Sequence, residues 1–248
     1  MRLERTRRGG VAVVVKHTLH PATFAAEGLA ALAHAGAPVP TVHEVRANHL
    51  VLDDLDAVNA ARHDGRPATH TEWAALGAAL AGVHSDVGTA HGWPRDNVIG
   101  TTTQHNAPDA DWATFHWDQR LAPHLEVLPA TVADRLRSAR ESLAERLDHD
   151  VVPSLLHGDL WSGNVLHGRW FIDPAVCRGD RELDLAFTAL FGGIPAAFTA
   201  GYDDAWPRDD GWPERLPLLQ LYHLLVHVRL FGDAYLPPVV ARLDAAGL

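Results

Sequence analysis

The chain has 248 residues, of which 47% are hydrophobic, so it can bury a core either as one large domain or as two small lobes. It carries 21 Lys and Arg against 31 Asp and Glu, and the resulting net charge of −10 excludes a general attraction to nucleic acid or to an anionic membrane surface. Small molecules are therefore the expected partners.

The cysteine content and the N-terminal segment indicate the compartment. The single cysteine, Cys177, cannot form an intramolecular disulfide or a cysteine-rich zinc site. Residues 1–8 lack the apolar core of a signal peptide, and no apolar run reaches the roughly 18 residues of a membrane-spanning helix. We therefore expect a cytoplasmic protein with no membrane contact, and nothing in the sequence indicates an oligomeric state.

Residues 1–55 predict a small, β-rich lobe with the order strand, helix, strand, strand. A β-branched stretch after Gly9-Gly10 indicates the first strand, which ends in Lys16. Apolar residues at helical spacing indicate one helix, and two short strands then flank a turn. The expected elements are strands at 11–16, 41–45 and 49–53 and a helix at 21–34.

Residues 56–248 predict a large, mainly helical lobe, which makes the fold class α+β. Thr131 with Asp134 resembles a capping box, and a β-hairpin is expected around Gly168-Arg169. The segment 222–228 is apolar at helical spacing and is expected to pack inside the chain. The expected helices cover 71–85, 111–121, 131–148, 181–191, 214–231 and the last dozen residues.

One short stretch carries the strongest functional signal. Asp159 follows His157-Gly158, and Asn164 lies five residues further on, between two apolar runs. A carboxylate on such a loop can accept a hydroxyl proton as a phosphoryl group arrives, as in protein-kinase-like sites. On its own, Asp159 could equally be a turn aspartate that caps its own loop.

Asn164 and Asp173 favour the catalytic alternative. Mg²⁺ prefers hard oxygen ligands and often takes only one or two of them from the protein. The expected hairpin between these two residues would bring both to one end, so we expect them to bind Mg²⁺ beside Asp159. The seventeen histidines form no metal-binding motif, and His157 is expected to bond backbone near Asp159.

A second group of residues concerns the nucleotide. Lys16 ends a strand and Glu27 lies inside the next helix, an arrangement in which the lysine contacts nucleotide phosphates and the glutamate positions it. Both residues are also common as solvated charges. Asp53 and Leu55 lie where a hinge between lobes would run, and backbone groups there could bond an adenine edge, although a plain strand end explains them equally well.

Motifs along nearly the whole chain point to one family. The main ones are His157 to Asn164 with Trp161 inside it, Ile172-Asp173-Pro174-Ala175, and Gly179 to Ala186. They resemble the fructosamine kinases, which are relatives of the aminoglycoside and choline phosphotransferases within the protein-kinase-like fold. The tryptophan after Asp-Leu and the Gly-Asp-Arg-Glu run are the most specific of these similarities.

The resemblance implies ATP- and Mg²⁺-dependent phosphorylation of a sugar hydroxyl on a ketoamine, a sugar joined to an amine by glycation. It implies the role of general base for Asp159 and metal ligation for Asn164 and Asp173. Nucleotide contacts are implied for Lys16, with Glu27 in support.

The acceptor pocket is implied to include Trp161, Asp180 and Arg181. Trp161 could simply pack, however, and Asp180 with Arg181 could form a structural ion pair. For Asp184, a carboxylate at a helix start, we expect hydrogen bonds to the backbone of a nearby loop at least as much as a catalytic role.

The N-terminal part departs from the family pattern. Family members usually have a further strand and a phosphate-covering loop before the lysine strand, whereas fifteen residues precede Lys16 here. Gly9-Gly10 is either a hairpin tip or a remnant of that loop, and a chain start placed too far downstream would also explain the difference. The alternatives are a kinase for another hydroxylated amine or sugar, such as an aminoglycoside, and a nucleotide-binding module without catalysis.

Overall fold

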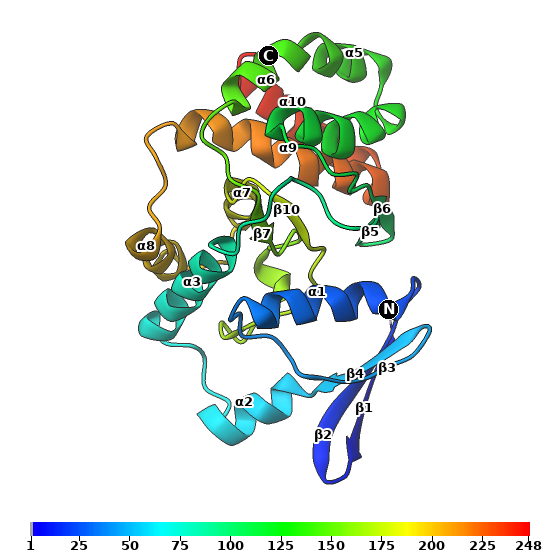
Figure 1. The fold of residues 1–248 in the computed structure, drawn as a ribbon, viewed down its shortest axis with the longest axis vertical. Helices are drawn as coiled ribbons and strands as arrows, with labels where there is room; N and C mark the ends of the chain where they lie inside the picture. The colour runs from blue at the N-terminus through cyan, green and yellow to red at the C-terminus, as the bar shows by residue number, and fades with distance from the viewer. Residues whose placement is uncertain (1) are drawn as a thin grey trace.

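The computed structural model describes residues 2–248, and its N-terminal part is a four-stranded sheet with one helix (Figure 1). The strand order is β1-β2-β4-β3, with antiparallel pairing throughout. Leu50 and Leu52 of the sheet pack with Leu29 of the helix, as the period-two alternation of a strand requires. The elements are β1 (Arg2–Arg8), β2 (Val11–His17), α1 (Ala22–His34), β3 (Val42–Val45) and β4 (His49–Asp53).

Strand β1 is an element that the sequence did not predict, because its residues are mostly exposed and lack apolar alternation. It pairs with β2 along its whole length, from Arg2 opposite His17 to Arg8 opposite Val11. Gly9 and Gly10 form the turn with φ angles of +56° and +84°, values that side-chain-bearing residues rarely adopt. Of the two interpretations of Gly9-Gly10, the hairpin tip is therefore the right one.

The rest of the chain is mainly helical. Helix α9 lies centrally, between α7 and α10 in Figure 1, and most of its residues are buried, including Leu218, Leu221 and Leu225. The helices are α2 (Leu55–His63), α3 (His70–His84), α4 (Trp112–Phe115), α5 (Ala130–Ser138), α6 (Arg140–Leu147), α7 (Glu182–Leu190), α8 (Ala196–Ala205), α9 (Trp212–Phe231) and α10 (Leu236–Ala245).

Helices α3 and α8 approach each other closely because each has a glycine at the crossing. A Cβ atom on Gly77 would lie 1.9 Å from the Phe198 carbonyl oxygen, and one on Gly201 would lie 2.0 Å from the Ala74 carbonyl oxygen. Both distances are far below van der Waals contact, so any larger residue would force the helices apart. The contact fixes the position of α3, whose last residue, His84, reaches the candidate active site.

The predicted helix over 131–148 is in fact two helices, α5 and α6, which meet at Ala139. The expected capping box of Thr131 and Asp134 is wrong, because Pro129 precedes the first turn and no side chain caps it. The Asp134 carboxylate instead lies 2.6 Å from Arg137, one turn further on.

The helix expected over 111–121 begins as predicted. The Asp111 carboxylate accepts a hydrogen bond from the Thr114 N–H at 2.7 Å, as an N-cap does. From His116 to Leu121 the backbone widens into a π-helix, and a 3₁₀-helix follows over Ala122–Val127.

Three short antiparallel pairs of strands position the site. The pair β8 (Val165–Leu166) and β9 (Trp170–Phe171) is the predicted hairpin around Gly168-Arg169. The sequence did not indicate the other two pairs. They are β5 (Asn97–Ile99) with β6 (Thr102–Gln104), and β7 (Ser154–Leu156) with β10 (Cys177–Gly179).

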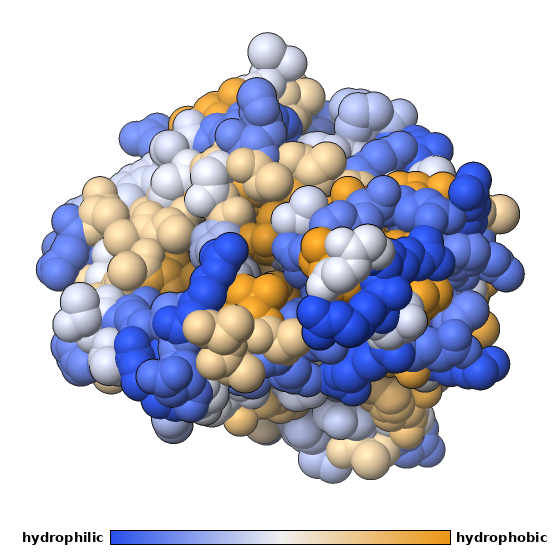
Figure 2. Space-filling view, turned by 90° about the horizontal axis from the view of Figure 1, so that it is seen from below, coloured by the Kyte–Doolittle hydropathy of each residue, from blue (hydrophilic) through white to orange (hydrophobic). Residues whose placement is uncertain are grey.

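The surface at the end that carries the β-sheet is shown in Figure 2. Hydrophilic side chains project there, and hydrophobic ones lie mainly in recesses between them. No helix within residues 2–248 is both long and apolar enough to cross a membrane.

Candidate active site

Asp159 lies on the loop between β7 and β8, directly after Gly158, a glycine that no other residue could replace. Gly158 has a φ of +80°, and a Cβ atom there would lie 1.9 Å from the Ala175 carbonyl oxygen. The loop therefore runs in direct contact with the segment that follows Asp173.

The Asp184 carboxylate holds this loop through hydrogen bonds to its backbone, as expected. It accepts hydrogen bonds from the backbone N–H groups of His157 at 2.7 Å and Gly158 at 2.9 Å, and it lies 3.2 Å from His84 Nε2. Burial opposes its ionisation, but the hydrogen bond from His84 and the other partners hold the pKa of Asp184 below its usual value. The residue is completely buried, so its role is to hold the loop rather than to meet a substrate.

The imidazole of His157 also bonds backbone, as expected, and its tautomer follows from its partners. The Asp159 N–H donates to Nδ1 at 3.2 Å, so Nδ1 carries the lone pair. Nε2 therefore carries the proton and donates it to the Ile172 carbonyl oxygen at 3.0 Å. The ring thus joins the Asp159 loop to the segment that leads to Asp173.

Asn164 holds Asp159 in place. Its side-chain amide donates to the Asp159 carboxylate at 2.9 Å and to the Asp159 carbonyl oxygen at 2.8 Å. Burial raises the pKa of Asp159 to about 7, the negative charges of Asp173 and Asp184 act in the same direction, and the Asn164 hydrogen bond opposes them. A carboxylate that titrates near neutrality can exchange a proton with a hydroxyl at physiological pH.

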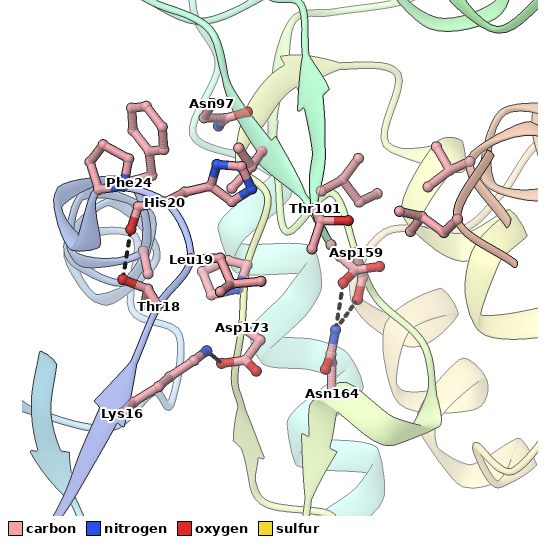
Figure 3. A pocket seen from close by; sticks show the side chains of 18 of the residues that line it. Lys16, Thr18, Leu19, His20, Phe24, Asn97, Thr101, Asp159, Asn164 and Asp173 are labelled. Carbon is pink, nitrogen blue, oxygen red and sulfur yellow. Dashed lines mark hydrogen bonds and ion pairs between the residues drawn. The ribbon is translucent and has the colours of Figure 1, made fainter. Parts of the chain in front are cut away.

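Asp173 lies opposite Asp159, and Lys16 reaches it from strand β2 (Figure 3). The Lys16 ammonium forms an ion pair with the Asp173 carboxylate. Asp173 has a φ of +54°, which turns the chain between β9 and Pro174. The Ile172 N–H donates to the Asn164 carbonyl oxygen at 3.0 Å, so the hairpin brings Asn164 and Asp173 to one end, as expected.

These residues share one cavity of about 410 Å³. Lys16, Trp161, Asn164 and Asp173 line it together with Asp159. Since Asn164 uses its amide nitrogen for Asp159, its Oδ1 is the atom that can face a cation, and the Asp173 carboxylate supplies further hard oxygen atoms. The donor set fits Mg²⁺ better than a soft or nitrogen-preferring metal.

The β5–β6 hairpin forms one wall of this cavity and is fixed by buried polar side chains. Asn97 donates to the Val176 carbonyl oxygen at 2.8 Å, and Gln104 donates to the Ala175 carbonyl oxygen at 2.9 Å. Tyr222 of α9 donates to Gln104 Oε1 at 2.8 Å. The wall, helix α9 and the segment after Asp173 therefore form one hydrogen-bonded unit.

The expected contact between Glu27 and Lys16 is wrong. The Glu27 carboxylate pairs with Arg95, whose Nε lies 3.1 Å from it, and Ala25 is the neighbouring α1 residue that lines the cavity. Residues two positions apart on a helix point in directions that differ by about 200°, so Glu27 points away from the wall that Ala25 forms. The sequence spacing placed a carboxylate on α1 but not on the side that faces Lys16.

Asp53 and Leu55 do not line the cavity. The Asp53 carboxylate accepts a hydrogen bond from the Thr41 N–H at 3.0 Å and lies 2.7 Å from His43. Leu55 is buried as the first residue of α2. The structure thus accounts for both by the plain alternative, a strand end and a helix start, and gives no support to the expected nucleotide contacts.

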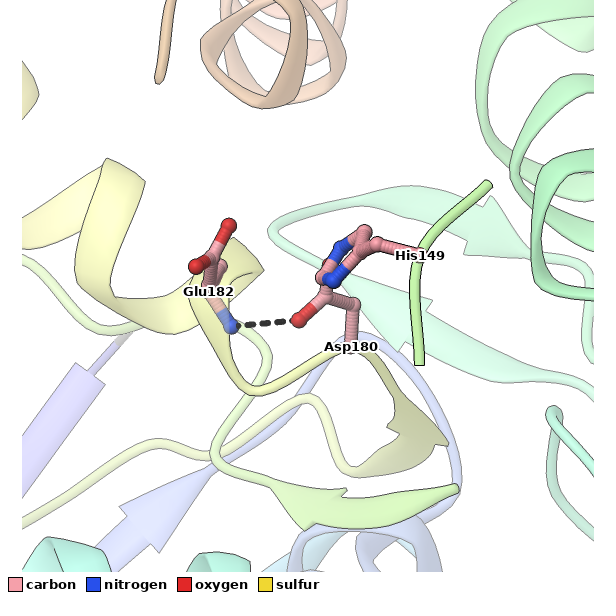
Figure 4. Close-up of side chains that lie close together, drawn as sticks. All are labelled: His149, Asp180 and Glu182. Carbon is pink, nitrogen blue, oxygen red and sulfur yellow. Dashed lines mark hydrogen bonds and ion pairs between the residues drawn. The ribbon is translucent and has the colours of Figure 1, made fainter. Parts of the chain in front are cut away.

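The structure also corrects the positions of Asp180 and Arg181, which lie outside the cavity. Asp180 accepts a hydrogen bond from the Glu182 N–H at 2.9 Å and lies 3.0 Å from His149 (Figure 4). Arg181 stacks on Trp206 at 4.3 Å and donates to the Trp206 carbonyl oxygen. Neither lines the cavity expected to hold the acceptor, and they do not pair with each other. Asp180 contacts His149, and Arg181 contacts Trp206.

His149, Asp180 and Glu182 lie close enough together to resemble a metal site. Arg215 already occupies this place, since its guanidinium donates two hydrogen bonds of 2.7 Å to the Glu182 carboxylate. The Arg215 guanidinium neutralises the Glu182 carboxylate, as a metal ion would, so we interpret the cluster as structural.

Several cavity residues were not singled out from the sequence. His20 comes from the β2–α1 connection, Phe24 comes from the first turn of α1, and His227 and Phe231 come from the end of α9. The segment 222–228 was expected to be core, and its residues are largely buried, but His227 faces the cavity. The polar and aromatic residues at the C-terminal end of an otherwise apolar helix were the available signal.

Comparison with solved structures defines the class of protein. The chain aligns over 99% of its length with a choline kinase of Streptococcus pneumoniae, at 15% identity, 89% coverage of that chain and a TM-score of 0.62. This likeness shows the fold alone. With Lys16, Asp159, Asn164 and Asp173 in one cavity, the chain has the protein-kinase-like fold of small-molecule kinases.

The chain belongs to the fructosamine kinase family, whose sequence pattern matches residues 7–246. A structure from Thermobifida fusca, described as a candidate fructosamine-3-kinase, aligns with 99% of this chain and 93% of that one, at 30% identity and a TM-score of 0.85. A probable ketoamine kinase of Synechocystis is 38% identical over 225 residues, 84% of this chain and 72% of the relative. The match to a probable ketoamine kinase of Enterococcus faecium spans 62% of that protein's length and 64% of this chain.

Proposed function

We propose that the protein is an ATP- and Mg²⁺-dependent kinase that phosphorylates a sugar hydroxyl of a ketoamine, with Asp159 as the general base. The observation that carries this proposal is the meeting of Lys16, Asp159, Asn164 and Asp173 in one cavity of a fructosamine kinase family member. Within this proposal, residues 1–55 bind the nucleotide and residues 56–248 hold the catalytic loop and the acceptor.

Lys16, Asn164 and Asp173 would hold the nucleotide and its metal. Asn164 Oδ1 and the Asp173 carboxylate are hard oxygen ligands on facing sides of one hairpin, and Lys16 is the only Lys or Arg among the described cavity residues. The metal would neutralise charge that develops on the transferred phosphoryl group. Lys16 would exchange its contact with Asp173 for a nucleotide phosphate.

Asp159 would take the proton from the acceptor hydroxyl. As it does so, the hydroxyl oxygen would bond to the γ-phosphorus of ATP, and the bond between the γ-phosphorus and the ADP oxygen would break. The elevated pKa, about 7, makes the carboxylate basic enough for this transfer while leaving it ionised above neutrality. Asn164 keeps the carboxylate oriented through its 2.9 Å hydrogen bond.

The acceptor would bind between Asp159 and Trp161. The Trp161 side chain lines the cavity and is 39% exposed, so it is not a core residue, and an indole face of this kind can pack on a sugar ring. This exposure supports a role for Trp161 in binding the acceptor. Asp180 and Arg181 differ from it because they do not line the cavity.

The test is the release of ADP by purified protein with ATP, Mg²⁺ and several fructosyl-amines, with Asp159→Asn as the matched control. We expect turnover in the wild type, and a loss of at least about a hundredfold in the variant with nucleotide binding retained in calorimetry. Better turnover of an aminoglycoside would correct the acceptor. Nucleotide binding without transfer to any acceptor would indicate a non-catalytic module instead.

A further inference from the structure

A group of aromatic side chains lies exposed at one end of the cavity. Phe231 at the end of α9 is 62% exposed, and Phe191 just after α7 is 42% exposed. Tyr235 lies 5.8 Å from Phe231 and 6.3 Å from Phe191, measured between ring centroids. We refer to Phe191, Phe231 and Tyr235 as the aromatic shelf. Large apolar side chains that gather on a surface usually serve a binding role.

The shelf continues the cavity wall. Phe231 belongs to both, and His227, which lines the cavity, lies 4.8 Å from Phe191 and 4.9 Å from Tyr235. The loop after Phe191 also touches the catalytic loop, because a Cβ atom on Gly193 would lie 2.8 Å from the Ser162 side chain. A molecule with one end at Asp159 can therefore extend onto the shelf without crossing the protein.

The charge around the shelf suits a cation. The segments 187–193 and 231–236 contain no Lys or Arg and carry one acidic residue, Asp233. Arg229, the nearest arginine in the sequence, is turned to Pro123, His124 and Glu126. His227 donates Nδ1–H to the His223 carbonyl oxygen at 2.7 Å, and burial lowers the pKa of His227, which favours the neutral form of the ring. Aromatic faces without competing cations attract an ammonium group.

We propose that the aromatic shelf binds the amine substituent of the acceptor, and that the preferred acceptors are ketoamines whose ammonium nitrogen carries an apolar chain of several carbons. This inference rests on the proposed function, and it adds a second binding surface beyond the sugar. The sugar hydroxyl lies at Asp159, and the alkyl chain beyond the nitrogen lies on Phe191, Phe231 and Tyr235. A ketoamine with a short substituent leaves the shelf unused.

The test compares fructosyl-hexylamine with fructosyl-methylamine in the wild type and in Phe231→Ala and Phe191→Ala. Both substitutions truncate exposed side chains, and a thermal melt checks that the variants fold. We expect the wild type to bind and turn over the hexyl compound about tenfold better, and each variant to lose most of that preference. Phe191 does not line the cavity, so Phe191→Ala should change the kinetics with the methyl compound less than about twofold. Val152→Ala, which truncates a remote residue that is 41% exposed, is the control and should keep the preference.

Calorimetry with both ketoamines and a non-hydrolysable ATP analogue decides the matter even without turnover. If neither compound is phosphorylated, the proposed function fails. The binding role of the aromatic shelf is tested separately, by the difference in affinity between the hexyl and the methyl compound. Equal affinity of the wild type for the two compounds, or an equal loss of affinity for both in Phe191→Ala, would overturn the shelf. A dimer in sedimentation that becomes monomeric in Phe231→Ala would also overturn it, because a second copy would then cover these residues.

Discussion

The Lys16 ammonium and the Asp173 carboxylate form an ion pair that joins strand β2 to the segment after β9. The two groups proposed to hold nucleotide phosphate and metal thus satisfy each other in this structure. Because α1 presents Ala25 to the cavity and pairs Glu27 with Arg95, Asp173 is the carboxylate that positions Lys16.

Substitution of either partner should separate their roles. We expect Lys16→Met to raise the KM for ATP by about tenfold or more, since a phosphate contact is lost. We expect Asp173→Asn to lower kcat by about a hundredfold or more and to weaken the dependence on Mg²⁺ concentration. Steady-state kinetics at several Mg²⁺ concentrations measure both, with the exposed Asp56→Asn as a control. If Asp173→Asn kept the kcat of the wild type, Asp173 would have no part in the catalytic site.

The pH dependence of catalysis should follow Asp159. A general base works in its ionised form, so kcat/KM should rise with pH, reach half its maximum near pH 7 and level off above it. A profile of kcat/KM from pH 5 to 9 measures this, with a coupled assay that is checked at each pH. If the midpoint of the kcat/KM profile lay near pH 4, burial would not raise the pKa of Asp159 as expected.

The same residue should make the fold less stable at high pH. Asp159 has a pKa of about 7 in the folded state against an ordinary value of 3.8, so the folded state holds its proton more tightly than the unfolded state. Its favourable contribution is complete below pH 4 and is lost as the pH rises through 7. Asp159→Asn stays neutral, so we expect this variant to exceed the wild type in stability above pH 7, by on the order of 4 kcal/mol, and to match it near pH 4. Urea unfolding at both pH values measures the difference, and no change with pH would contradict the shifted pKa.

Two glycines of α3 provide a matched pair. Gly77→Ala would place a methyl group 1.9 Å from the Phe198 carbonyl oxygen and should destabilise the fold by about 2 kcal/mol or more. Gly82 lies in the same helix with nothing within 4 Å of a built Cβ atom, so Gly82→Ala should stabilise by up to about 1 kcal/mol. The free energy of unfolding of each variant measures both effects. Equal changes in the two would show that the close approach to α8 is unimportant.

The parts of the structure that the sequence predicted are those with strong local patterns. The β-branched run before Lys16 and the spacing of Asp159, Asn164 and Asp173 around a hairpin were sufficient to predict the centre of the site. Strand β1 escaped prediction because an exposed, arginine-rich edge strand has no apolar alternation, and its pairing with β2 is what defines it.

The outer residues of the site depend on contacts that the sequence does not encode locally. Glu27 was the acidic residue at a plausible helix position, but packing sets the direction of the helix, and it turns Gly28 toward Pro174, whose side chain would lie 3.0 Å from a Cβ atom on Gly28. Asp180 and Arg181 belong to a motif that is specific to the family, yet their partners are His149 and Trp206. A family motif can thus mark residues that build the fold rather than residues that touch a substrate.

The two sides of the cavity are held by contacts of different strength. Buried hydrogen bonds through Asn97 and Gln104 tie the β5–β6 wall to helix α9 and to the segment after Asp173. Helix α1 reaches that wall through the Arg95–Glu27 pair, whose side chains are each 47% exposed, and exposed pairs contribute less than about 1 kcal/mol. Further along α1, Leu32 is buried in one core cluster with Leu80 and Val176, so this end of the helix is firmly attached. A motion that widens the cavity for a nucleotide would therefore break the exposed pair and pivot α1 about its buried end, while the catalytic loop and α9 keep their relative positions.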